Sequence, residues 1–286
     1  AWVKFAETYY PEMLPHISSA KSPIGMQGPT IKTYFARKMG IDPQKIVNVA
    51  VTPCTAKKYE IRRDEMNAAA RHLGIEGMRD MDYVITTREL ALLAKDANID
   101  FTTLEDQVYD DFMGLGSGAG VIFGNTGGVM EAALRTVYEV VTGKTLEKVE
   151  FTAVRGVEAI KEAEYDLNGT KVKVAVTSGL DNAKKLLDMV KSGEKDYTFI
   201  EVMACPGGCV NGGGQPQQPG SVRNTVDIRA LRAKVLYDED AAKTIRKSHE
   251  NPAIKELYET YLGKPGSEKA HHLLHTTYVK RKINEV

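Results

Sequence analysis

The sequence has little cysteine, no excess of charge of either sign and no long apolar run. Only three of its 286 residues are cysteine, and an odd number in so long a chain argues against a disulfide framework. Lys plus Arg equals Asp plus Glu at 38 each, so a general attraction to nucleic acid or to an anionic membrane is not expected. Since no apolar stretch approaches about 20 residues, we expect no membrane span.

The chain opens with Ala1-Trp2-Val3-Lys4 and shows neither an initiating methionine nor a signal peptide. This start is typical of the middle of a protein. We therefore expect a fragment or a processed product, with part of any functional site upstream of Ala1.

Short β-rich runs alternate with helical stretches along the chain. Strands are predicted over residues 46–51, around 83–85, and over 120–123, 171–176 and 197–203. Helices are predicted over about 88–98, 129–142 and 181–191. Repeated strand–turn–helix units favour an α/β fold with largely parallel sheets, in which ligands collect at the carboxyl ends of strands. Cys54 and Cys205 both follow predicted strands, which predicts one shared cleft.

The chain becomes helical and charged after about residue 227, so residues 1–226 and 227–286 are predicted to be separate parts. His271, His272 and His275 lie close together in the second part. They predict either a surface tail that wraps the core or a metal site. No cysteine or acidic cluster accompanies them, which favours the tail.

Cys205 and Cys209 flank Pro206-Gly207-Gly208, a segment that can curl around a bulky group because glycine tolerates positive φ. Zinc knuckles place further Cys or His nearby, and thiol–disulfide enzymes use Cys-x-x-Cys; neither pattern is present. An iron–sulfur cluster fits better. Such clusters usually take four thiolates, so the fourth is expected upstream.

Cys54 could be an inert buried thiol or a third thiolate ligand. Lys57 could turn back toward it and donate to an anionic ligand, or it could form a solvated helix start together with Lys58. The glycine-rich segment 124–128 could cradle an anion on backbone N–H groups, or it could simply be a tight turn. It lacks the glycine spacings of nucleotide-binding motifs.

Three stretches together resemble the signatures of the [FeFe]-hydrogenase, or iron-only hydrogenase, family. The second signature, PC-x-x-K-x-x-E, is matched by Pro53, Cys54, Lys57 and Glu60. The third, E-x-M-x-C-x-x-x-C, is matched by Glu201, Met203, Cys205 and Cys209. The first, TSCCP, would end just before Ala1, and Ala1-Trp2-Val3 resembles its tail. The resemblance covers essentially the whole chain.

The resemblance implies reversible interconversion of hydrogen gas with protons and electrons at an H-cluster. This cofactor is a [4Fe-4S] cubane joined through a cysteine to a di-iron subsite that carries CO, CN and a dithiolate. The implied metal ligands are Cys54, Cys205 and Cys209, with Cys209 as the bridging thiolate. The other implied site residues are Lys57 as donor to a cyanide, Ser18 as proton relay, Met203 beside the di-iron unit, Pro23, Phe123 and Thr52 around the cofactor, and Glu201 as a framework carboxylate.

The resemblance also implies a division of labour along the protein. Residues 1–226 would form the H-cluster domain, with the cofactor in a cleft between two α/β lobes, and residues 227–286 a small-subunit-like segment that wraps the core. Additional [4Fe-4S] or [2Fe-2S] clusters would lie only in upstream domains. The expected partners are ferredoxin or other redox subunits, NAD-linked ones included, and the upstream portion that carries the first motif. The expected location is the cytoplasm of an anaerobic bacterium.

Two departures from the family pattern bear on function. Without the first signature the chain lacks one cubane ligand and the proton-delivering thiol, so it is expected to be inactive alone. Thr52 stands where many members have Met, which could mark an altered potential, altered oxygen tolerance or a hydrogen sensor. A further alternative is an iron–sulfur assembly protein that holds a cubane without hydrogen chemistry. Lys57 and Met203 argue against it, since a plain cubane has no cyanide to bind.

Overall fold

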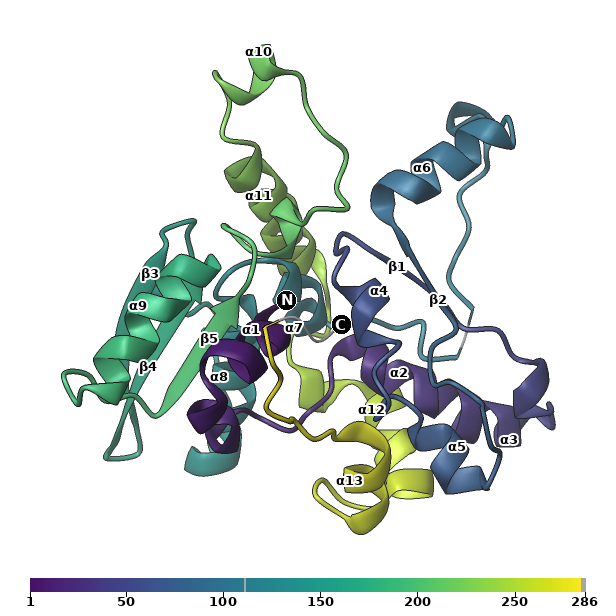
Figure 1. The fold of residues 1–286 in the computed structure, drawn as a ribbon, viewed down its shortest axis with the longest axis horizontal. Coiled ribbons are helices and arrows are strands. Elements are labelled where there is room, and N and C mark those ends of the chain that lie inside the picture. The colour runs from purple at the N-terminus through teal and green to yellow at the C-terminus, as the bar shows by residue number, and fades with distance from the viewer. Residues whose placement is uncertain (111, 284–286) are drawn as a thin grey trace. The chain divides into compact units, whose positions relative to one another are not determined.

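The computed structural model describes residues 1–110 and 112–283, and the chain divides into two compact units (Figure 1). Unit 1 comprises residues 1, 3–112 and 255–286, and unit 2 comprises residue 2 and residues 113–254. Within the described residues, no helix is both long enough and apolar enough to cross a membrane.

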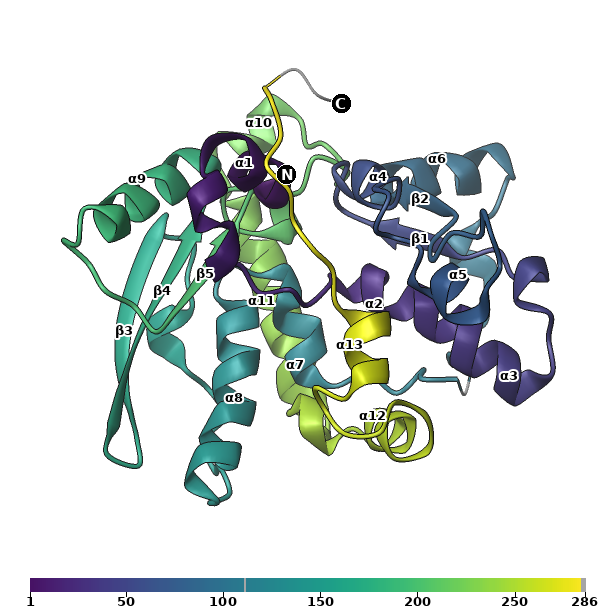
Figure 2. The same cartoon turned by 60° about the horizontal axis from the view of Figure 1, so that its bottom comes forward.

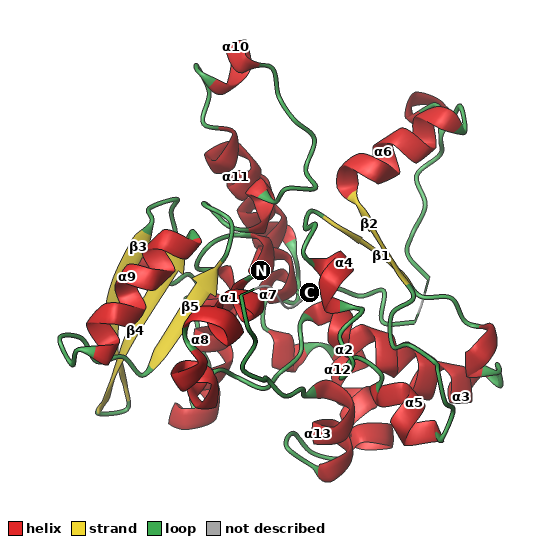
Figure 3. Cartoon of the chain, in the orientation of Figure 1, coloured by secondary structure: helices red, strands yellow, loops and turns green. Residues whose placement is uncertain are grey.

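Unit 1 contains a two-stranded parallel sheet of β1 (Val49–Thr52) and β2 (Tyr83–Thr86), in which Val49 lies opposite Tyr83 (Figure 3). Its α-helices are α1 (Trp2–Tyr9), α2 (Pro23–Thr30), α3 (Ala36–Met39), α4 (Lys57–Glu60), α5 (Ala68–Leu73), α6 (Thr87–Asp96) and α13 (Glu268–Leu274). The 3₁₀ helices of this unit are η1 (Pro11–His16), η3 (Pro43–Lys45) and η4 (Phe101–Thr103), and its π-helices are η2 (Ile31–Phe35) and η9 (Tyr258–Leu262). The chain enters it from unit 2 through α12 (Pro252–Leu257).

The strands of unit 1 are fixed by a small apolar core and by a helix cap. Ala50, Met81 and Val84 are buried together, with Ile24 of α2 and Ile61 packed against them. At the end of β2, the Thr86 hydroxyl and the Glu89 carboxylate form a reciprocal capping box, which starts α6. The helix predicted over about 88–98 is therefore confirmed.

Carboxyl-terminal residues complete unit 1. α13 packs against α2 and α5, and His275 pairs with Ala20 in an isolated antiparallel bridge. The rings of His271 and His275 are stacked with their centroids 4.6 Å apart, and His275 Nδ1 lies 2.8 Å from the Ser19 hydroxyl. The helical tail is thus part of this unit's core.

Unit 2 is built on a three-stranded sheet in the order β3 (Ile160–Leu167), β4 (Thr170–Ser178), β5 (Phe199–Met203). The β4–β5 pair is parallel, and the β3–β4 pair is antiparallel. The α-helices are α7 (Gly118–Val121), α8 (Gly128–Thr142), α9 (Leu180–Lys191), α10 (Gly220–Arg223) and α11 (Ile228–Ala242), and the shorter turns are η5 (Ile122–Gly124), η6 (Thr152–Val154), η7 (Cys209–Asn211) and η8 (Ser248–Glu250).

Helices α8 and α9 lie alongside this sheet (Figure 2). Val174 and Val176 of β4 are buried in one cluster with Met130 and Leu134 of α8. Since successive strand residues point to opposite faces, Ala175 faces the other side, where α9 contacts β4. The sheet is therefore covered on both faces, as expected for a strand pair of parallel type.

Two parts of unit 2 differ from the sequence prediction. The strand predicted over 120–123 is wrong, because α7 and η5 occupy this stretch; the Ser117 hydroxyl caps α7, and an apolar run this short carries no decisive periodicity. Strand β3 was not predicted at all. The charged residues of this strand obscure its apolar pattern in the sequence. The hairpin signal is the turn, because Asn168-Gly169, with φ of 57° and 86°, forms the two-residue turn typical of a hairpin.

Residues after 226 contribute to both units. α11 contacts α7 and η5 in unit 2, whereas η9 and α13 lie in unit 1. The division of function between residues 1–226 and 227–286 remains a prediction.

Candidate functional site

The turn that carries Cys54 follows directly from β1 in unit 1. The Thr52 hydroxyl is buried at the end of the strand; it accepts the Cys54 N–H at 3.3 Å and lies 3.1 Å from the Cys54 carbonyl oxygen. Pro53 limits the backbone between them. The structure therefore places Cys54, half-buried, in a turn held by the residue that differs from the common family pattern.

Lys57 begins α4, the short helix after this turn. Its ammonium donates to Glu60 Oε2 at 2.6 Å, and the Ser22 hydroxyl donates to Glu60 Oε1. Ser22 also caps α2, since its oxygen accepts the Gly25 N–H, and Pro23 is the first residue of that helix. Lys57 and Ser22, the neighbour of Pro23, are thus connected through two hydrogen bonds in unit 1.

Ser18 lies in the exposed loop that precedes α2. Its hydroxyl oxygen accepts the Ala20 N–H at 3.3 Å, and its carbonyl accepts the Tyr278 hydroxyl at 2.7 Å. These contacts are those of a loop residue. The relay role of Ser18 remains a prediction.

Cys205 and Cys209 lie in a loop that continues from β5 in unit 2, and Cys205 is two residues beyond Met203 at the strand's end. Gly207 and Gly208 have φ of 83° and 100°, conformations that favour glycine. A β-carbon on Gly208 would lie 2.5 Å from Thr126 N and 2.8 Å from the Gly124 carbonyl oxygen. The loop is therefore packed directly on the turn before α8.

Further hydrogen bonds hold this loop in place. Gly207 N–H donates to the Ser178 hydroxyl at 3.1 Å, and Thr126 N–H donates to the Gly207 carbonyl at 3.3 Å. The Cys205 and Cys209 carbonyls accept the N–H groups three residues further on, at 3.0 and 2.9 Å. Within the described residues, both thiols and that of Cys54 are outside any disulfide.

Phe123 belongs to η5, which contacts η7, the turn that begins at Cys209. Gly124 lies beside Val210, whose Cγ1 would be 3.7 Å from a β-carbon at that glycine. Unit 2 therefore brings Met203, Cys205, Cys209 and Phe123 to neighbouring segments, and unit 1 does the same for Thr52, Cys54 and Lys57.

Glu201 fills the position at which the sequence allows an anion cradle. Its carboxylate accepts Gly127 N–H at 2.6 Å and Met130 N–H at 2.7 Å, at the amino end of α8. Burial raises the pKa of Glu201, while these two N–H donors and the nearby Lys161 act in the opposite direction. The carboxylate ties the strand that leads to the cysteines to α8, as a framework residue would.

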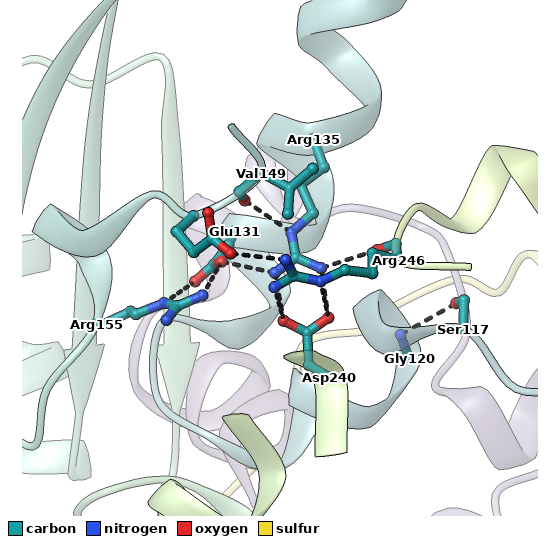
Figure 4. A network of polar contacts seen from close by, with 9 residues as sticks. Ser117, Gly120, Glu131, Arg135, Val149, Arg155, Asp240 and Arg246 are labelled. Carbon is teal, nitrogen blue, oxygen red and sulfur yellow. Dashed lines mark hydrogen bonds and ion pairs between the residues drawn. The ribbon is translucent and has the colours of Figure 1, made fainter. Parts of the chain in front are cut away.

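A buried ion network that the sequence did not predict lies next to this turn. Arg135 and Arg246 both contact the carboxylate of Asp240, and Arg135 and Arg155 both contact that of Glu131 (Figure 4). The side chains of Arg135, Glu131 and Asp240 are fully buried. The spacing of Glu131 and Arg135 on a helix could have suggested one pair, but no local signal identifies Asp240.

One further polar cluster has the geometry of a metal site. Carboxylate or ring atoms of Glu139, His249 and Glu250 lie within 4.8 Å of one another. Lys247 already occupies this cluster, since its ammonium contacts Glu139 at 2.6 Å and Glu250 at 2.9 Å. The chain itself therefore supplies the cation for this cluster.

Comparison with known proteins gives consistent results. Residues 1–213 match the family described as "Iron only hydrogenase large subunit, C-terminal domain", and residues 226–281 match "Iron hydrogenase small subunit". Iron hydrogenase 1 of Clostridium pasteurianum is 50% identical over 98% of this chain and 47% of its own length. A solved [FeFe]-hydrogenase of Chlamydomonas reinhardtii is similar with a TM-score of 0.81 and 42% identity, over 99% of this chain and 75% of that one.

More distant similarity leads to another class of protein. Cytosolic iron-sulfur assembly component 3 of Bos taurus is 31% identical over 97% of this chain and 57% of its own length. The chain spans about half the length of the curated relatives that it matches.

Proposed function

The chain belongs to the iron-only hydrogenase family, and from this premise we propose that it is the catalytic domain of a hydrogenase. The proposed reaction is the reversible conversion of H₂ into two protons and two electrons. The 50% identity to an iron hydrogenase over nearly the whole chain supports this proposal most directly.

The residues present fit an H-cluster. Three half-buried thiols are soft ligands suited to iron–sulfur clusters. Gly207 and Gly208 have the positive φ values of a sharply turned segment, and such a loop between Cys205 and Cys209 suits two thiols that bind one bulky group. Cys54, Cys205 and Cys209 would hold the cubane, with Cys209 as the bridge, and the fourth ligand would come from the first motif. When bound, the cofactor supplies the bond chemistry of hydrogen and the electron store.

The chain's own residues would surround this group. Lys57 would donate to a cyanide, and Met203, Thr52, Pro23 and Phe123 would exclude water around it. Ser18, which is exposed in this structure, would pass protons toward solvent. Glu201 holds backbone rather than substrate, so we assign it no proton transfer.

The wider assignments follow from the same premise. We propose that residues 1–226 form the H-cluster domain and that 227–286 form its small-subunit-like segment. Ferredoxin or another redox subunit, NAD-linked ones included, would exchange electrons through further clusters carried upstream. The cytoplasm is the proposed location.

The test is infrared spectroscopy of a longer form that carries the first motif, after loading with a synthetic di-iron complex. Bands of metal-bound CO and CN, together with hydrogen evolution from a reduced dye, are expected. Cys209→Ser should abolish the bands, and the 286-residue chain alone should evolve no hydrogen. A loaded protein with the bands but no hydrogen evolution would refute the catalytic proposal and leave a hydrogen sensor.

The similarity to an iron–sulfur assembly component supports a second candidate, a protein that holds a cubane without hydrogen chemistry. In that case iron would bind to the three cysteines, yet the CO and CN bands would be absent. The same infrared measurement therefore separates the two candidates.

A further inference from the structure

Three hydrogen-bonded side chains in unit 1, Ser22, Glu60 and Lys57, link the start of α2 to α4. Ser22 donates to one carboxylate oxygen of Glu60, and Lys57 donates to the other at 2.6 Å. Each oxygen of Glu60 thus has its own partner. Lys57 and Glu60 are both about a quarter exposed, at 23% of the side chain.

The two helices that carry these side chains pack on the same apolar core. Ser22 caps α2, and Ile24 of that helix packs on the buried Ala50 and Val84. Ile61, the residue after Glu60, packs on the same cluster. Because α2 and α4 share this core, the carboxylate of Glu60 is held from both sides.

Lys58, the next residue on the same helix, forms an ion pair of the ordinary exposed kind. Lys58 contacts Glu89 at 2.5 Å, but these side chains are 42% and 45% exposed, and Glu89 belongs to the cap of α6. Exposed pairs of this kind contribute little, because solvent screens them. The Lys57 pair differs in its partial burial and in the second hydrogen bond that orients its carboxylate.

We propose that Glu60 is a positioning residue for Lys57 and that Ser22 braces Glu60. An ammonium has three N–H donors, and Glu60 takes one of them. The carboxylate fixes the direction of the other two and balances the charge of a partly buried cation. This inference rests on the proposed function, since it is the cyanide-bearing cofactor that Lys57 would meet.

The arrangement itself is testable on the 286-residue chain without cofactor. In limited acetylation read by mass spectrometry, Glu60→Gln should raise the rate at Lys57 roughly two- to fivefold, the factor for loss of a partly buried ion pair. The rate at Lys58 should not change. Ser22→Ala should act in the same direction and Ser22→Thr should restore the slow rate, whereas Glu89→Gln should affect Lys58 alone.

The role toward the cofactor is tested by infrared spectroscopy of the loaded longer form. Glu60→Gln and Ser22→Ala should displace the cyanide band more than the CO bands, while Ser22→Thr and Glu89→Gln should leave the spectrum unchanged. An unshifted cyanide band in Glu60→Gln, or equal acetylation rates at Lys57, overturns the inference. If the unsubstituted loaded protein lacks the bands altogether, the proposed function fails instead.

Discussion

Adding a single methyl group at Gly208 should disrupt the loop that carries Cys205 and Cys209. Its φ of 100° and ψ of −169° lie in a region that is essentially reserved for glycine, and alanine there costs about 1–3 kcal/mol. The new β-carbon would lie 2.5 Å from Thr126 N, and backbone atoms cannot rotate aside as a flexible side chain can. Overpacking of this kind costs about 1–3 kcal/mol, so Gly208→Ala should destabilise the protein by about 2–6 kcal/mol in total.

Gly143→Ala is the matched control in the same unit. Gly143 also has a positive φ, at 65°, but a β-carbon there would meet no heavy atom within 4 Å beyond its immediate surroundings in the chain. Only the strain of about 1–2 kcal/mol should therefore remain. Urea unfolding of both variants gives the difference, which combines the close packing at Gly208 with the greater backbone strain of its ψ of −169°.

Hydrogen exchange should add a local signature to this comparison. Gly208→Ala should speed exchange at the N–H groups of Thr126 and Gly207, which bond within the packed loop, and Gly143→Ala should not. If the two variants lose equal stability and exchange alike at these sites, the close packing of the cysteine loop on the turn before α8 is wrong.

Three other perturbations have expected outcomes. Asp240→Asn should cost about 3–5 kcal/mol in urea unfolding, because it removes the fully buried negative charge that Arg135 and Arg246 share, whereas the exposed Asp238→Asn should change stability little. Lys247 holds the pKa of Glu139 at about 2, below its ordinary 4.5. The pair therefore stabilises the fold above pH 4.5, and this stabilisation is lost as the pH falls toward 2. Glu139→Gln should make the melting temperature depend less on pH between these two values. Thr52→Ala should cost about 1 kcal/mol and speed alkylation of Cys54, and Thr52→Ser should do neither.

Local sequence patterns predict much of the fold. The β1, β2, β4 and β5 strands and the helices α6, α8 and α9 all lie near their expected positions. In α8 and α9 the apolar spacing also agrees with burial, since Met130, Leu134 and Leu186 are buried. The stretch over 120–123 misleads because an apolar run of four residues suits either a strand or a helix. There the tertiary contact decides: a β-carbon on Gly118 would lie 2.0 Å from Asp240 Oδ1, so α7 requires glycine where α11 approaches.

The sequence indicates the candidate ligands of the site but not the residues that hold their segments in place. Cys54 and the Cys205–Cys209 pair are conspicuous because cysteine is otherwise absent from the chain. The partners of those segments are distant in sequence: Ser178 for Gly207, Glu201 for Gly127, Ser22 for Glu60. Hydrogen bonds between residues so far apart produce no periodic pattern in the sequence, so only the folded structure identifies them.

The carboxylate at the amino end of α8 also restricts what this glycine-rich turn can bind. Gly127 and Met130 direct their N–H donors to Glu201, a negative charge that belongs to the protein. A phosphate brought by a nucleotide would have to displace that side chain and would meet its charge on the way. A turn that resembles a phosphate-binding loop thus binds a carboxylate of the protein itself, and this contact joins β5 to α8 without any external ligand.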